Sequence, residues 1–436
     1  MSQFETVEET LGKSLTASSR SLQKGWGIEF SGLLRGILRL GVGEATAWIA
    51  SFFLYAYVSR VYGVALLGII AIAQTIATYV TMATDQGLRL IGARIVAKNP
   101  SLATCVVRPL IRKRLILCMA SVTLGGIYAM RGPVPSEARL YVLGFVLAVI
   151  PYAFTLDWMA WGLNRMAWLG AWRGLIKVVF VAGAVLGMHF TGATLLPLVL
   201  ANFAAISLGA ILLAVLWYSV WRTRVIQPHE SAVHELPKQL LWGPVLYLGM
   251  ATMLNLVFNN ADTLILAGMT SSVEVGRYNA AYKLIFIILS GYYLITQSLF
   301  PFLSAAPYDL HLRAWLYRAL LVVAAAGTAI AVGIAVFSRQ ILSIIYGNDL
   351  GSMSLLRVLA FALPMDFCTS LMAVFLASRG RDKLLLSLTV AAAALNIGLN
   401  FVLIPRMQAQ GSAWATVVSY GFLFAALLMS VPLVNA

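Results

Sequence analysis

Apolar runs, each about 20 residues long, recur along the whole chain and are separated by short polar connectors. A helix rises ~1.5 Å per residue, so each run can cross the ~30 Å hydrocarbon layer of a membrane. The sequence lacks the ~10-residue alternating segments that are typical of a transmembrane β-barrel. The pattern predicts an all-α polytopic membrane protein with twelve transmembrane helices, at residues 37–59, 64–84, 114–130, 139–161, 168–189, 194–217, 241–267, 276–300, 315–337, 355–377, 384–404 and 412–434.

One part of this pattern occurs twice. The stretch from Arg60 to Lys98 has an echo at Val273–Pro301, in which Gly68 aligns with Gly276. Parallel internal repeats are a recurring plan of transporters. We therefore expect two six-helix lobes around a central polar cavity. The expected parts are a cytoplasmic tail, an N-lobe, a cytoplasmic linker and a C-lobe, at residues 1–27, 28–217, 218–240 and 241–436.

Composition supports the membrane assignment, since 61% of the 436 residues are hydrophobic and only 11% are charged. A soluble core of this size cannot bury so much apolar surface. The net charge of +15 could indicate a nucleic-acid partner. Most Lys and Arg residues, however, lie in connectors on one side of the predicted spans, which indicates membrane topology with both termini in the cytoplasm. The heaviest basic cluster follows the second span: Arg89, Arg94, Lys98, Arg108, Arg112, Lys113 and Arg114.

Patterns for catalysis and for metal binding are missing from the sequence. The three cysteines are far apart, and the histidines do not have the spacing of metal ligands. The sequence has no Ser/His/Asp set and no Gly-rich phosphate loop. The predicted external loops are also too short to carry the chemistry of an outer-face polymerase or ligase. We therefore expect a protein that is not an enzyme and that has no cofactor, no metal and no nucleic-acid partner.

Three segments in order carry a family resemblance. The first is VSRVYGVALLGIIAIAQTI followed by TDQGLRLIGARIVAK, and the second is NNADTLILAGMTSSVEVGRYNAAYKL. The third is SRGRDKLLLSLTVAAAALNIGLNFVLIPRMQAQGSAWATVVSYG. Together they cover about a third of the chain. The ordered set resembles the polysaccharide (O-antigen, Wzx-type) flippase family of the multidrug/oligosaccharidyl-lipid/polysaccharide exporter superfamily.

The resemblance implies a transporter of the bacterial cytoplasmic membrane. It would flip undecaprenyl-pyrophosphate-linked oligosaccharides from the inner to the outer leaflet by alternating access, for surface polysaccharide biosynthesis. The implied partners are a polyprenyl-pyrophosphate-linked glycan, membrane lipids, and polysaccharide polymerase and chain-length proteins. One alternative is a multidrug/cation antiporter of the same superfamily, which would need a net acidic cavity. The other is an outer-face polysaccharide polymerase or ligase.

Basic residues inside the predicted spans are candidates for substrate binding, because charges at membrane depth are costly and mark function. Lys177 lies near the middle of its span, and Arg173 lies one turn earlier on the same face. We expect the two to bind the pyrophosphate. The alternative for Arg173 is an ion pair with Asp157. Lys283 either contributes to the same cavity or pairs with Asp262, which lies at a similar depth.

Acidic residues inside the spans are candidates for coupling or gating. Asp366 follows Pro364, where we expect a kink. It is either a coupling-ion site or cavity counter-charge, or a neutral side chain bonded to backbone freed by the kink. Asp262 is also a candidate for coupling or gating, and the alternative is the salt bridge with Lys283. Glu44 either forms a gate or pairs with a nearby arginine, Arg35 or Arg39.

Asparagines mark two of the predicted spans. Asn255 and Asn259, with Asn260, make one side of their span polar, and we expect this face to line the cavity and contact substrate. Asn396 and Asn400 repeat the pattern later in the chain. For this second pair we expect hydrogen bonds between neighbouring helices, which is the common role of Asn within a membrane.

Overall fold

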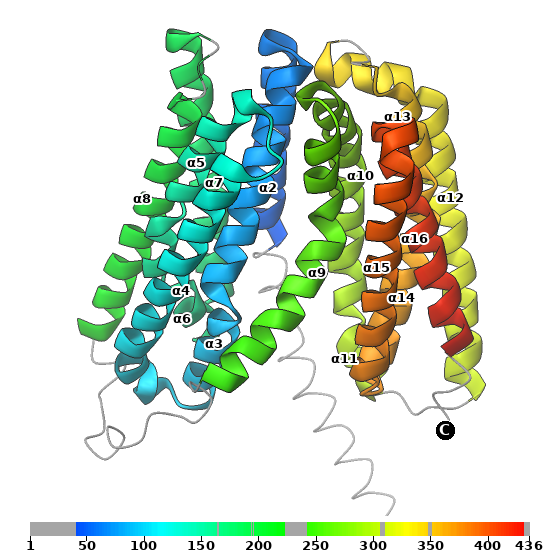
Figure 1. The fold of residues 1–436 in the computed structure, drawn as a ribbon. Helices are drawn as coiled ribbons and strands as arrows, with labels where there is room; N and C mark the ends of the chain where they lie inside the picture. Colours follow the sequence, from blue (N-terminus) through cyan, green and yellow to red (C-terminus); the bar gives the residue numbers. More distant parts are fainter. Residues whose placement is uncertain are drawn as a thin grey trace, which may run out of the picture.

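Helices are the only regular elements in the residues that the structure describes, which are 41–163, 165–192, 194, 196–222, 242–305, 310–347 and 351–430. Figure 1 shows their arrangement in a computed structural model of the chain. Eight helical segments are long and apolar enough to cross a membrane. The all-α polytopic fold is thus confirmed, while the count of twelve crossings stays a prediction.

The helices fall into two groups, which stand side by side in Figure 1. The first helix group (residues 41–222) contains a helix at 41–62, α2 (Val64–Asp85), α3 (Leu88–Lys98), η1 (Pro100–Leu102), α4 (Ala103–Arg131), η2 (Ser136–Ala138), α5 (Arg139–Leu147), η3 (Ile150–Phe154), α6 (Asp157–Gly162), α7 (Met166–Thr191) and α8 (Leu196–Arg222). The second helix group (residues 242–430) contains α9 (Trp242–Met269), α10 (Ser272–Ser298), α11 (Phe300–Ala305), α12 (Leu310–Tyr346), α13 (Met353–Ala360), α14 (Ala362–Ser378), α15 (Asp382–Met407) and α16 (Ala409–Ser430).

Two predicted spans are broken four residues before a proline. The predicted span 139–161 divides because α5 ends at Leu147, and Pro151 follows in η3. The predicted span 355–377 divides because α13 ends at Ala360, and Pro364 follows in α14. A proline ring clashes with the carbonyl group four residues earlier and donates no hydrogen bond to it. The break near Pro364 therefore confirms the expected kink, and the one near Pro151 is a correction.

The chain between α2 and α4 is also more helical than its polarity suggested. The segment between the predicted spans 64–84 and 114–130 is largely helical, because α3 and the first turns of α4 occupy most of it. Gln86 and Gly87 have φ values of 40° and 75°, which turn the chain sharply between two helices. Without a side chain, Gly87 adopts this left-handed conformation at no steric cost. The turn places α3 at the lower end of Figure 1, beside α6.

The two helix groups meet where α2 packs against α10. Gly68 and Gly276 lie at this crossing, and a Cβ atom on either would overlap the backbone of the other helix. Small residues allow such close approach between membrane helices. Helix α9 leans across to the first group as well, with Gly249 against the Gln86 side chain. The largest buried apolar cluster therefore runs through both groups.

Candidate functional site

A cavity of about 490 Å³ lies inside the first helix group. Its walls come from the helix at 41–62 and from α3, η3, α6, α7 and α8. This volume is within the ~300–1,000 Å³ range of small-ligand pockets. The lining residues are Glu44, Ala47, Trp48, Ser51, Arg89, Tyr152, Thr155, Asp157, Trp172, Arg173, Ile176, Lys177 and Ile206. Three of the predicted site residues, Glu44, Arg173 and Lys177, therefore share one pocket.

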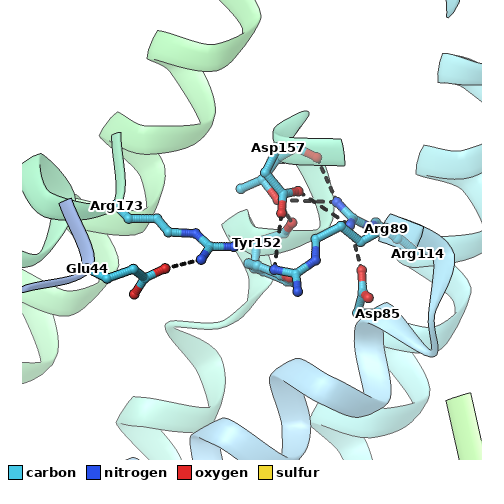
Figure 2. Close-up of polar contacts among 8 residues, drawn as sticks. Glu44, Asp85, Arg89, Arg114, Tyr152, Asp157 and Arg173 are labelled. Carbon is cyan, nitrogen blue, oxygen red and sulfur yellow. Dashed lines mark hydrogen bonds and ion pairs between the residues drawn. The ribbon is translucent and has the colours of Figure 1, made fainter. Parts of the chain in front are cut away.

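Arg173 forms an ion pair with Glu44 across this pocket, as Figure 2 shows. Both side chains are partly exposed, at 28% and 21%. The alternative that Arg173 pairs with Asp157 is thus wrong, because Glu44 reaches Arg173 from the facing helix. The alternative that Glu44 pairs with Arg35 or Arg39 concerns two residues outside the described part of the chain.

A network of buried charges lies on one side of the pocket (Figure 2). The fully buried Arg114 guanidinium donates to Asp85 Oδ1 at 2.5 Å and lies 3.5 Å from Asp157 Oδ1. It also donates to the Thr155 carbonyl oxygen at 2.7 Å. Arg89 lies 3.7 Å from the other oxygen of Asp157. The network ties α2, α3, α4 and α6 together, because each carries one of its charged groups.

Arg89 and Arg114 belong to the basic cluster predicted on the cytoplasmic side of the spans, and the sequence pattern did not connect them to the site. The structure corrects this, since Arg114 is buried within α4 and Arg89 lines the pocket. A usable signal was present. Asp85, Arg114 and Asp157 all lie at or near the predicted cytoplasmic ends of their spans. Opposite charges at the same depth can pair.

The charges around the pocket balance except for one ammonium group. Two carboxylates face two guanidiniums in the buried network, and Glu44 faces Arg173. Lys177 has no carboxylate partner among the described residues, and its Nζ lies 5.0 Å from the centroid of the Phe180 ring. Ammonium over an aromatic face gains a cation–π interaction. The positive charge of Lys177 therefore remains available to a ligand.

Lys283 adds a second unbalanced cation from the other helix group. Its Nζ lies 5.2 Å from the ring centroid of Tyr55 and 5.5 Å from that of Phe286. The ion pair with Asp262 is not formed, so that alternative is wrong. Lys283 turns toward Tyr55 of the first helix group instead. It lies close enough to Lys177 for the two charges to interact.

Asp262 is held in a cage of neutral donors inside the second helix group. Tyr278 and Thr416 donate to its Oδ2 at 2.7 and 2.8 Å, and Asn400 donates to its Oδ1 at 2.7 Å. Asn400 also bonds to Asn396. The expected helix-joining role of this asparagine pair is thus observed, with Asp262 as the partner on α9. The side chains of Asn255 and Asn259, predicted to line the cavity, lie outside the described part of the structure.

Asp366 lies on α14 with its side chain partly exposed. It makes no hydrogen bond or ion pair with the part of the chain that the structure describes. The alternative that it bonds to backbone freed by the kink is therefore wrong. The break before Pro364 ends at Ala360, and no hydrogen bond joins the Asp366 carboxylate to it among the described residues.

Comparison with solved structures shows where this fold recurs. The lipid II flippase MurJ in an inward closed conformation matches with a TM-score of 0.68 and 13% identity, covering 90% of this chain and 87% of that one. An inward-facing multidrug resistance MATE family transporter of the MOP superfamily matches with a TM-score of 0.69 and 13% identity, covering 92% and 99%. At such identities the likeness shows the fold alone.

A third match is a MOP superfamily transporter from Pyrococcus furiosus, for which reverse polarity of the binding pocket has been taken to suggest a different function. Its TM-score is 0.57 and its identity 15%, covering 92% of this chain and 96% of that one. No curated protein matches the chain in sequence. A family model described as "Polysaccharide biosynthesis protein" matches residues 33–306, which is more than half of the chain. The chain therefore belongs to the polysaccharide biosynthesis protein family.

Proposed function

We propose that this protein flips polyprenyl-pyrophosphate-linked oligosaccharides from the inner to the outer leaflet of the bacterial cytoplasmic membrane, for surface polysaccharide biosynthesis. The observation that carries the proposal is the pair of uncompensated cations, Lys177 and Lys283, one from each helix group. A pyrophosphate brings the matching negative charge. Membership of a polysaccharide biosynthesis family supports a glycan as the rest of the cargo.

The site would bind the pyrophosphate between the two helix groups. Lys177 and Lys283 supply point charges, and Arg173 can exchange its bond to Glu44 for a bidentate bond to a phosphate. Charged groups interact strongly in a pocket that excludes water. The polyprenyl tail would stay in the hydrocarbon layer throughout, so its movement between the leaflets requires no transfer into a polar environment. Only the polar head then has to cross.

Alternating access would come from rocking of the two helix groups, treated as an N-lobe (28–217) and a C-lobe (241–436) joined by the linker 218–240. Both α2 and α10 begin at the upper end of Figure 1, so their contact closes that end. The pocket is lined by α3 and α6, which lie toward the lower end. That end carries the basic connectors predicted to be cytoplasmic. This arrangement supports loading from the inner leaflet.

Two carboxylates of the second helix group are the proposed coupling or gating groups. Asp366 has no hydrogen-bond or ion-pair partner among the described residues, and as a carboxylate it can bind a proton or a cation. Asp262 joins α9, α10, α15 and α16 through its hydrogen bonds, so a change of its charge would alter how these helices pack. An ion can shift a conformational equilibrium only if it binds one state better than the other. Glu44 is the proposed gate on the pocket side, released when Arg173 turns to substrate.

A multidrug/cation antiporter is the second candidate. The observations that favour it are the open carboxylate of Asp366 and the fold shared with a MATE family transporter. A cationic drug, however, would meet Lys177 and Lys283, which have no carboxylate partner among the described residues. The two carboxylates that line the pocket, Glu44 and Asp157, are already paired with arginines. Like charges in a desolvated site repel. The charge balance thus supports an anionic substrate.

A reconstituted assay tests the proposal. Proteoliposomes would carry a fluorescent undecaprenyl-pyrophosphate-linked oligosaccharide, and a membrane-impermeant quencher would report how much reaches the opposite leaflet. We expect flipping by the native protein and little or none by Lys177→Ala. Ethidium efflux from the same vesicles measures the rival activity. Ethidium transport without glycolipid flipping would overturn the proposal.

A further inference from the structure

The pocket of the first helix group is lined by two kinds of residue. One kind is charged or polar and includes Arg89, Asp157, Arg173 and Lys177. The other kind, here called the aromatic wall, is apolar or aromatic: Ala47, Trp48, Trp172, Ile176 and Ile206. An inorganic anion needs only the charged and polar residues. The aromatic wall indicates that the ligand also presents an apolar face.

The indole ring of Trp172 is fixed in place. Its Nε1–H donates to the Gly209 carbonyl oxygen at 3.0 Å across the α7–α8 interface. A Cβ atom on Gly209 would lie 2.9 Å from that nitrogen, so only glycine lets α8 approach the ring so closely. A side chain with a fixed rotamer loses little entropy on binding a ligand. Trp172 is therefore a preorganised aromatic surface of the pocket.

Trp48 provides a second indole with a free donor. It lies one helical turn after Glu44, on the same side of the helix at 41–62, and both side chains line the pocket. Its Nε1–H has no hydrogen-bond partner among the described residues. Glu44 uses Oε1 for Arg173 and has Oε2 left over. One unused donor and one unused acceptor thus lie beside the aromatic wall.

We propose that this part of the pocket binds the first sugar of the lipid-linked glycan, which deepens and rests on the function proposed above. The apolar C–H face of a pyranose ring would stack on Trp172 and Trp48, because the negative face of an aromatic ring attracts the weakly positive C–H groups. Sugar hydroxyl groups would bond to Trp48 Nε1 and Glu44 Oε2. The adjoining pyrophosphate would reach Lys177.

The sugar fits this wall better than the isoprenoid tail does. An isoprenoid has no group that can use the indole N–H or the carboxylate, and burying them beside it without partners would be costly. Ligand pockets commonly combine an apolar lining with a few placed polar groups that give specificity. The two tryptophans therefore make the site selective for a glycosylated pyrophosphate over a bare one.

Binding to two probes tests this subsite. Purified full-length protein in detergent would be titrated with undecaprenyl pyrophosphate and with undecaprenyl-pyrophosphoryl-N-acetylglucosamine. We expect the native protein to bind the glycosylated lipid about tenfold more tightly, which corresponds to ~1.4 kcal/mol. Trp172→Ala should remove this preference and leave binding of the bare lipid unchanged. Trp48→Phe keeps a ring but removes the donor, so it should lose part of the preference.

Trp168→Ala is the matched control, since Trp168 lies one turn earlier on α7, is exposed and does not line the pocket. Melting temperatures would show that each variant is folded. If Trp172→Ala does not fold, Trp48→Phe takes its place as the test of the subsite. If Trp172→Ala weakened the binding of both lipids equally, the aromatic wall would contact the isoprenoid tail, and the sugar subsite would be overturned. Equal affinity of the native protein for both lipids would overturn it as well. If the native protein bound neither lipid, the proposed function itself would fail.

Discussion

Gly68 of α2 and Gly276 of α10 lie in backbone contact. A Cβ atom on Gly68 would overlap the Ser272 carbonyl group, and one on Gly276 would overlap the Val64 carbonyl group. The same two glycines align in the sequence repeat. Equivalent positions of the repeat therefore meet each other, as they do in a contact with two-fold symmetry. This contact joins the two helix groups at the end away from the pocket.

The first prediction concerns this glycine contact. Gly276→Ala should force α2 and α10 apart, because the added Cβ atom would overlap the Val64 carbonyl oxygen. This atom belongs to the backbone, so the clash can be relieved only by moving a helix and not by turning a side chain. We expect lower glycolipid flipping and greater labelling of cysteines introduced between the groups. Gly291→Ala on the same helix is the control, since a Cβ atom there meets nothing within 4 Å. Equal effects of both substitutions would show that the contact has no special role.

The second prediction concerns the buried charge network. Arg114→Ala should leave Asp85 and Asp157 facing each other without their buried cation. Removing one partner of a buried ion pair costs about 3–5 kcal/mol of folding free energy. The loss should appear as a lower melting temperature in detergent. Arg112→Ala, at an exposed position of the same helix, should change it little. A stable Arg114→Ala protein would mean that the network does not hold α2, α4 and α6 together.

The third prediction concerns the bond between Glu44 and Arg173. Each single substitution, Glu44→Arg or Arg173→Glu, should destabilise the protein, because it sets like charges in contact. The double swap should restore about 0.5–3 kcal/mol of folding free energy, the usual size of coupling between contacting residues. It should not restore flipping, since the cation then projects from the other helix. A swap with normal flipping would show that Arg173 acts only as a partner of Glu44.

The fourth prediction concerns Asp366. Asp366→Asn keeps the size of the side chain and removes its charge, so a protein coupled through this group should lose its response to an ion or proton gradient. Flipping would be measured in vesicles with and without such a gradient. Unchanged acceleration by the gradient would remove Asp366 from coupling and leave Asp262, in its hydrogen-bonded cage, as the remaining candidate.

Helix positions could be predicted from the sequence because length and apolar character carry that signal. Predicted spans such as 64–84 and 412–434 overlie α2 (Val64–Asp85) and α16 (Ala409–Ser430). Mid-span cations were found for the same reason, since Lys177 interrupts an apolar run. The break near Pro151 could have been found too, because proline has a known effect on the carbonyl four residues earlier.

Partners across helices could not be predicted, because a linear pattern gives depth along a helix and not which helices are neighbours. Lys283 and Asp262 have similar depth, but they point to different surroundings. Arg114 lies at the border of an apolar run, at the same depth as Asp85 and Asp157, which makes a pairing possible but does not show that the arginine is buried. Only the packing of α2, α4 and α6 reveals it as a buried anchor.

The most direct test of the account is the binding of undecaprenyl pyrophosphate to purified protein. We expect at least a tenfold loss of affinity in Lys177→Ala/Lys283→Ala, partial recovery in Lys177→Arg/Lys283→Arg, and no change in Lys383→Ala, which removes an exposed cation from α15. Binding by the native protein should also weaken as salt rises, since the attraction is between charges. Unchanged affinity in the double alanine variant would contradict the claim that these two lysines bind the pyrophosphate.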